Sequence, residues 1–483
     1  MTKPDYDWFI HNWPDSAQVQ LLDQDAVFQF RQQVMDAAQN AGRSDGPTLF
    51  GHCLYRALYE QDRFAAVTTI LDDIQPPQPK VSSFKLGRVR QKDRCVADNR
   101  GQFQALGISA FWLAHAYRHD RDVFDRFCNY AEGMCCHYVR WFGAHDWSGG
   151  SSPKNSFYWD SMHDTVSALW QRGLRAQITL ATRRHMITDP NGYAAQWGQL
   201  VESIPDGVIC CEMVNEWNHD HNGWADHEVR AMGDAFAIET SVLCALSAPA
   251  GATWQDDMEP RLRGLNDQHS AALKTVHYPR RDNTFEGPWR SVRQPWHTKG
   301  YGFIANNEPA RWDKTQGNKV EVAVATHLVA WVCGCGLSCH HDKAGVHLSP
   351  DVLQYPDRQQ AETLQIVWQK IQQALPDDLP NWTPTRVGGA WNGPAHPFPS
   401  LEHQQWTDDN NPADQGVSRC FAAVRDDECV MVLTGVRQHV KLVEYHSRHY
   451  EVYSLRNGEQ VYQGRGGNVT LRGSDAFVVV TEP

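Results

Sequence analysis

Two glutamates, Glu216 and Glu308, each stand at the end of a short apolar run of the sequence. Glu216 ends the run 207–216 (GVICCEMVNE), and Glu308 ends the run 301–308 (YGFIANNE). A pair of carboxylates that face one another can cleave an acetal, because one donates a proton to the leaving oxygen and the other attacks the carbon. The two residues therefore predict glycosidic bond cleavage, provided that the fold brings them together.

The elements that must position this pair alternate between short β-rich runs and longer helical runs, which is typical of consecutive βα units. Eight such units within one region match a (β/α)8 TIM barrel, in which catalytic residues lie at the carboxyl ends of the strands. Glu216 would end the fourth strand and Glu308 the seventh. The expected strands are 107–113, 138–142, 174–181, 207–216, 241–247, 274–278, 301–308 and 336–341, and the clearest expected helices are 123–136, 161–172, 193–203, 226–238 and 359–375.

The rest of the chain divides around this barrel. Residues 1–97 form an N-terminal extension that ends in a predicted β-hairpin, and residues 98–375 form the barrel. Residues 376–415 are rich in Pro, Gly, Asn and Asp, which indicates a linker or wrapping segment. Residues 416–483 contain short alternating strands separated by turn residues, which predicts a small C-terminal antiparallel β-sandwich.

Composition limits the possible partners. The 483 residues carry a formal net charge of −12 and no basic stripe, which disfavours nucleic acid. No apolar run is long enough to span a membrane. The first residues show no secretory signal, so we expect a cytoplasmic protein or one released by lysis, as phage-encoded proteins are. We expect a carbohydrate partner, and the oligomeric state is left open.

The ends of the fourth and seventh strands carry a resemblance to a known group. Asn215-Glu216 on strand four, with Glu308 on strand seven, resembles the clan A glycoside hydrolases. That group includes families 5 and 39 and uncharacterised bacterial and phage-encoded members. The resemblance covers roughly residues 98–375, and it implies a retaining double displacement on an oligo- or polysaccharide. Glu308 would then be the nucleophile and Glu216 the general acid/base.

The same resemblance assigns further residues to the site. Arg140 in YVRWFG matches the clan's strand-two arginine, a partner of the nucleophile, and Asn215 matches the asparagine that binds the sugar 2-hydroxyl. His277 and Tyr278 end strand six, where the clan often carries a His or Tyr near the nucleophile. On strand eight the clan usually has a Trp, whereas this chain has His340-His341, so we expect His341 to line the site. Tryptophans in loops are candidate sugar platforms or packing residues, namely Trp147, Trp159, Trp217, Trp289, Trp296 and Trp312.

Three alternatives stay open. A barrel that kept its cleft without turnover would be a non-catalytic carbohydrate-binding protein. Cys333, Cys335, Cys339 and the following histidines offer ligand types that zinc prefers, which would suit a metal-dependent hydrolase. Their spacing is not that of a standard zinc site, so we favour small buried residues and expect no metal and no cofactor. Glu212 is the reserve catalytic candidate.

Two expectations concern packing. Glu321 lies in the predicted seventh helix, and we expect it on a solvated face. The C-terminal domain is expected to buttress the barrel, because no aromatic triplet stands on one of its predicted faces.

Overall fold

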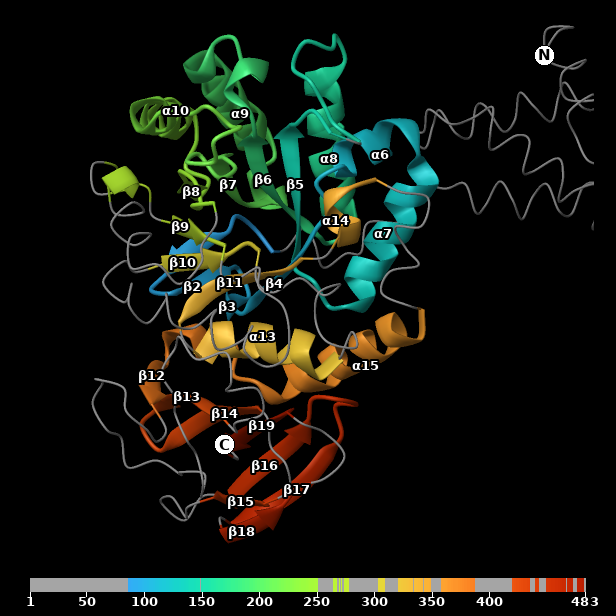
Figure 1. The fold of residues 1–483 in the computed structure, drawn as a ribbon, viewed down its shortest axis with the longest axis vertical. Coiled ribbons are helices and arrows are strands. Elements are labelled where there is room, and N and C mark those ends of the chain that lie inside the picture. Colours follow the sequence, from blue (N-terminus) through green and yellow to red (C-terminus); the bar gives the residue numbers. More distant parts are fainter. Residues whose placement is uncertain are drawn as a thin grey trace, which may run out of the picture. The chain divides into compact units, whose positions relative to one another are not determined.

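A computed structural model gives the fold of the chain (Figure 1). All the residues that it describes belong to one compact unit, Ser82–Pro483, and the predicted N-terminal extension lies outside them except for its last residues. The described residues are 86–147, 149–250, 264–266, 269, 271, 273–277, 303–308, 320–332, 334–341, 343–348, 358–386, 419–434, 439–442, 449–465, 467–471 and 476–481.

Eight strands form one parallel sheet in the order β8-β7-β6-β5-β4-β11-β10-β9. Each paired neighbour is parallel, and the outermost strands β8 and β9 lie in contact, so the sheet nearly closes on itself. The predicted (β/α)8 barrel is confirmed. Its strands are β4 (Ala105–Ser109), β5 (Tyr138–Ala144), β6 (Arg175–Ala181), β7 (Val208–Val214), β8 (Cys244–Ala245), β9 (Leu273–Val276), β10 (Phe303–Asn306) and β11 (Cys335–His340).

The strands are buried on both faces, which explains why they appear in the sequence as continuous apolar runs. Every residue of β5, β6 and β7 is buried. One apolar cluster joins strands that lie far apart in the sheet order, and it includes Tyr138 on β5, Ile209 on β7 and Phe303 on β10. Gly107 lies against the ring of Tyr138, so a side chain at this position would collide with it.

Helices follow the strands on the outside, where their apolar stripes cover the sheet. The five helices predicted most clearly are confirmed as α7 (Arg121–Gly133), α8 (Tyr158–Gln171), α9 (Pro190–Ser203), α10 (Asp226–Glu239) and α15 (Arg358–Ala374). One more helix, α6 (Leu113–His119), begins where the first strand was expected to continue. Asp120 then caps α7, since its side chain accepts a hydrogen bond from the backbone N–H of Val123 at 3.2 Å.

Three short antiparallel strands precede the barrel: β1 (Arg90–Lys92), β2 (Cys95–Asp98) and β3 (Gly101–Phe103). β2 and β3 pair across the turn at 98–101, which confirms the predicted hairpin. Buried Asp98 ties this hairpin to β6 through an ion pair with Arg175 at 3.0 Å. Burial alone would raise the pKa of Asp98, but hydrogen bonds from Arg100 and the charge of Arg175 lower it below its ordinary value.

The C-terminal region is antiparallel, as predicted. Its larger sheet has the order β12-β13-β14-β19-β16-β17, and β15 pairs with β18 in a second sheet. β12 comes from the segment expected to be a linker. The strands are β12 (Thr383–Arg386), β13 (Arg419–Arg425), β14 (Glu428–Thr434), β15 (His439–Leu442), β16 (His449–Ser454), β17 (Gln460–Arg465), β18 (Gly467–Thr470) and β19 (Ala476–Thr481).

Helix α13 (Val320–Val332) lies between the barrel and the larger C-terminal sheet (Figure 1). It contacts β11 on one side and β13, β14 and β19 on the other, and all of its residues are buried. Glu321 is only 2% exposed, and Arg456 donates to it from Nε at 3.0 Å and from Nη2 at 3.2 Å. The expectation of a solvated Glu321 was therefore wrong, because the C-terminal sheet covers this face of the helix.

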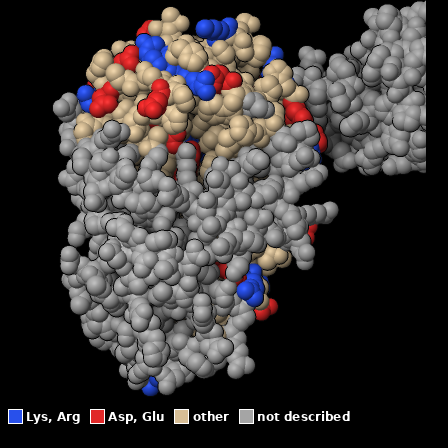
Figure 2. Space-filling view, in the orientation of Figure 1, with Lys and Arg blue, Asp and Glu red and all other residues tan. Residues whose placement is uncertain are grey.

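Among the described helices, none combines the length and the apolar character needed to cross a bilayer. Acidic and basic side chains lie beside one another over the described part of the face shown in Figure 2.

Candidate active site

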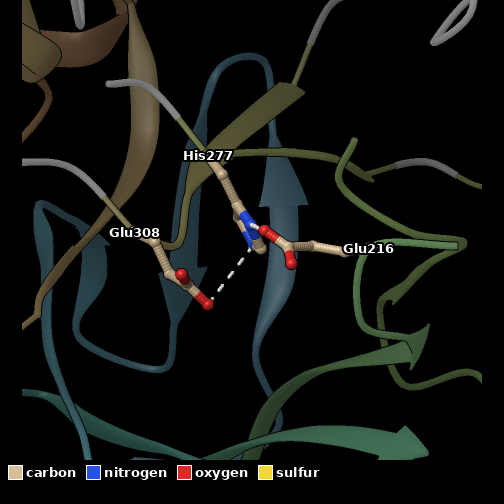
Figure 3. A group of neighbouring side chains, drawn as sticks. All are labelled: Glu216, His277 and Glu308. Carbon is tan, nitrogen blue, oxygen red and sulfur yellow. Dashed lines mark hydrogen bonds and ion pairs between the residues drawn. The ribbon is translucent and has the colours of Figure 1, made fainter. Parts of the chain in front are cut away.

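The two glutamates predicted from the sequence lie side by side at the barrel mouth (Figure 3). Glu216 follows β7 and is 6% exposed, and Glu308 follows β10 and is 2% exposed. His277, just after β9, stands between them. Its Nδ1 lies 3.2 Å from Oε1 of Glu216, and its Nε2 lies 3.7 Å from Oε1 of Glu308. Residues far apart in the chain thus converge on one imidazole.

The separation of the carboxylates bears on the chemistry that they can do. One oxygen of Glu216, one nitrogen of His277 and one oxygen of Glu308 all lie within 4.8 Å of one another. Carboxyl groups about 5 Å apart suit a direct attack on a sugar, whereas room for an intervening water requires roughly 6.5–9.5 Å. These three side chains are also close enough together to bind one metal ion, and no other such cluster of His, Cys, Asp or Glu is found among the described residues.

Arg140 on β5 connects the site to the barrel interior. Its Nη1 donates to Oε1 of Glu308 at 2.6 Å, and its Nη2 donates to Asn215 Oδ1 at 3.1 Å and to Glu212 Oε2 at 3.2 Å. Burial alone would lower the pKa of Arg140, but the two carboxylates outweigh it and raise that pKa above its ordinary value. The guanidinium is therefore a fixed positive charge beside Glu308.

Glu212 lies deeper, with no exposed surface. Its Oε2 accepts from Arg140 and from Thr179 Oγ1 at 2.8 Å, and its Oε1 accepts from the backbone N–H of Ala248 at 3.1 Å. Both oxygens are thus saturated, and the carboxylate holds the side of Arg140 that faces away from Glu308. Its described donors are Arg140, Thr179, Ala248, Thr275 and Asn307.

His341 lies on the other side of Glu308, at the end of β11. Its Nε2 is 3.8 Å from Oε2 of Glu308, and its Nδ1 is 2.7 Å from the hydroxyl of Ser109. The ring stacks against Phe111 at 5.4 Å between centroids. Ser109, which ends β4, did not stand out in the sequence, and neither did Thr179 or Thr275. The available signal was a hydroxyl residue inside a strand of the barrel.

The backbone at Glu216 is unusual, since its φ of +47° lies in the left-handed region that non-glycine residues rarely adopt. Asn222 secures this turn, because its Nδ2 donates to the carbonyl of Asn215 at 2.9 Å and to that of Glu216 at 3.0 Å. Strained backbone of this kind is concentrated at functional sites.

Trp217 was also assigned to the site from the sequence. Trp217 is only 4% exposed, and its Nε1 donates to Asp226 at 2.9 Å, so its ring presents little surface to a ligand. Tyr278 lies outside the described residues, as do Trp289, Trp296 and Trp312.

The cysteine-histidine segment does not converge on one point. Cys339 belongs to the apolar cluster inside the barrel, whereas the next residue, His340, has its ring 5.7 Å from that of His327 on α13. Neighbouring residues of a strand point to opposite faces, which accounts for the divergence. Burial lowers the pKa of His340 to about 4, so it is neutral at pH 7. Cys333 lies outside the described residues.

Solved structures share this architecture. One, titled a glycoside hydrolase, is 12% identical, with a TM-score of 0.58 over 82% of this chain and 96% of that chain. Another, a glycoside hydrolase family 5 structure from Bacteroides vulgatus, is 13% identical, with a TM-score of 0.56 over 83% of this chain and 93% of that chain. No protein-family model matches the sequence, and no curated protein matches it. The chain therefore shares the fold of these two solved structures.

Proposed function

We propose that this chain, which has the glycoside hydrolase fold, is a retaining glycosidase that acts on an oligo- or polysaccharide. The observation that carries the proposal is the convergence of Glu216 and Glu308 on His277 at the carboxyl ends of barrel strands. This is where barrel enzymes place their chemistry, and carboxylate oxygens within 4.8 Å of one another suit direct attack on the sugar better than the wider spacing of inverting enzymes.

The surroundings of the two carboxylates differ, which supports the assignment of their roles. Glu308 is paired with the permanent charge of Arg140 at 2.6 Å, so its ionised form is stabilised and its oxygen is aimed. Glu216 contacts the imidazole of His277 instead, in a buried place beside a second carboxylate. Two nearby carboxylates disfavour double ionisation, which leaves Glu216 as the one that carries the proton.

The reaction then runs in two steps. Glu308 attacks the anomeric carbon and forms an ester with the sugar, while Glu216 protonates the departing oxygen. Glu216 next takes a proton from water, whose oxygen attacks the same carbon and releases Glu308. Asn215, whose side chain accepts a hydrogen bond from Arg140, binds the hydroxyl next to the reacting carbon in this proposal.

Mechanism-based labelling tests the proposal. A panel of activated 2-fluoro-glycosides (gluco, manno and xylo) should trap an ester on the peptide that contains Glu308, detected by mass spectrometry. Glu308→Gln and Glu216→Gln should each lower turnover at least a thousandfold, while Glu321→Gln, whose carboxylate pairs with Arg456 of the C-terminal region, should keep it. Proton NMR should show a product with the anomeric configuration of the substrate. Inversion, or a label on another residue, would contradict the mechanism; sugar binding without turnover would favour the non-catalytic alternative.

A further inference from the structure

A pocket of about 370 Å³ opens at the carboxyl ends of β5 and β6. One wall is the segment that follows β5, and the other is the short helix η2 (Arg184–Met186) that follows β6. None of the residues assigned above to the reaction lines it. The lining includes His145, Asp146, Trp147, Lys154, Asn155 and His185.

Trp147 is held rigidly in this pocket. Its Nε1 donates to the carbonyl of Val346 at 3.1 Å, and its ring meets those of Phe142 at 5.7 Å and His145 at 4.6 Å. The indole is half-buried, so part of it remains available to a ligand. A fixed, partly exposed indole is a platform for the apolar face of a sugar ring and loses little conformational freedom on binding.

The polar lining complements such a ring. Asp146 is fixed by Arg183, whose Nη1 donates to it at 2.8 Å, so its carboxylate is a placed acceptor for hydroxyl groups. Lys154 and Asn155 line the same pocket and add donors. One aromatic face, with a few convergent polar groups of both signs, suits a neutral polyhydroxylated ligand.

Both walls are connected to the catalytic pair. The Trp147 wall reaches Glu308 through Phe111, which contacts Trp147 at 6.5 Å and stacks on His341, the neighbour of Glu308 at 3.8 Å. The η2 wall reaches Glu216 through Asn222. The carbonyl of Asn222 accepts a hydrogen bond from the backbone N–H of Arg184 at 2.8 Å, and its side chain donates one to the Glu216 carbonyl. Each wall is thus joined to one of the two glutamates by a short series of contacts.

We propose that this pocket is a second sugar subsite, which binds a pyranose unit of the substrate chain next to the unit that is cleaved. The proposal rests on the proposed function, and it names the substrate class more narrowly, as a glycan of at least two linked pyranoses besides the leaving group. Occupation of the pocket would align the chain over Glu216 and Glu308, and a single sugar would lack this contribution.

Substrate length tests the subsite. Wild type and Trp147→Ala are compared on an aryl monoglycoside and on the same glycoside extended by one and two sugar units. We expect kcat/KM on the extended substrates to fall roughly tenfold to a hundredfold in Trp147→Ala and to change less than threefold on the monoglycoside. Trp159→Ala is the matched control, because this half-buried indole packs against Tyr193 and Trp197 outside the pocket.

A second variant guards against misfolding. Asn155 is exposed, so Asn155→Ala should fold normally and lower kcat/KM on the extended substrates roughly threefold to tenfold. Equal losses on short and long substrates, or no loss on the long ones, would overturn the subsite. Calorimetry on Glu216→Gln separates the two proposals: oligosaccharide binding that depends on Trp147 but occurs without turnover in the wild type would keep the subsite and reject the glycosidase.

Discussion

Replacing Glu212 by Gln should impair catalysis without touching a residue that meets the substrate. The substitution keeps the shape of the side chain but turns one acceptor oxygen into a donor. Every described group around that carboxylate already donates to it. The Thr179 hydroxyl can rotate and accept a hydrogen bond instead of donating one. The NH2 group of the new glutamine should therefore take the place of Oε2, where it faces Nη2 of Arg140.

The expected size follows from what Arg140 loses. A buried charged hydrogen bond of 3.2 Å disappears and two donors are left facing one another, which should cost about 3 kcal/mol of unfolding free energy. The pairing at 2.6 Å with Glu308 survives, so the fold should persist. Arg140 then keeps only Glu308 and Asn215 as side-chain acceptors. The resulting displacement of Glu308 by a fraction of an ångström should lower kcat roughly tenfold to a hundredfold with little change in KM.

The assay combines urea unfolding, followed by tryptophan fluorescence, with steady-state kinetics on an activated aryl glycoside. Glu321→Gln is the matched control, because it weakens another ion pair between a buried carboxylate and an arginine, that with Arg456, where α13 meets the C-terminal region. We expect the control to lose stability and keep kcat. If Glu212→Gln lost stability and kept its kcat as well, the reasoning that this carboxylate positions Arg140 would be refuted.

Three further predictions follow. Arg140→Lys should lower kcat at least a hundredfold in the same kinetic assay, since one ammonium cannot reproduce a planar fork that spans Glu308 and Glu212. Burial sets the pKa of His340 at about 4, whereas in the unfolded chain it is near 6.5. Above pH 6.5 the residue is neutral in both states and should not change the unfolding free energy. Between pH 6.5 and 4 only the unfolded chain binds the proton, so the unfolding free energy should fall by up to about 1.4 kcal/mol per pH unit. Urea unfolding at several pH values should show that the unfolding free energy of His340→Asn depends less steeply on pH than that of the wild type. Cys135 has a φ of +56°, so Cys135→Gly should raise the unfolding free energy by about 1 kcal/mol, visible as a higher thermal midpoint.

The barrel could be predicted because buried parallel strands appear in the sequence as uninterrupted apolar runs. The same property hid α6. The stretch from Gly107 to His119 is apolar for most of its length, and periodicity alone does not separate a buried strand from a buried helix. The strand ends at Ser109 and the helix begins at Leu113.

At the site, the glutamates that follow β7 and β10 could be anticipated, and Arg140 through the resemblance, but the hydroxyl residues around them could not. Whether Thr179 or Thr275 points towards Glu212 depends on the stagger between strands distant in sequence. The prediction that Glu321 is exposed to solvent was wrong for a related reason. Its partner Arg456 lies 135 positions further along, in the turn after β16, and the packing of that region on α13 has no local signal in the sequence.

The burial of α13 on every side has a consequence for how this gene could be recombined. A carbohydrate-binding module joined by a flexible tether can be exchanged between enzymes, because its loss uncovers nothing. Here, removal of the C-terminal sheet would expose Val322 and its apolar neighbours to water and leave the Glu321 carboxylate without Arg456. A chimera that joins another domain after α15 would therefore need polar substitutions on the face of α13 that the C-terminal sheet covers. We expect the barrel and the C-terminal sheet to be exchanged only together.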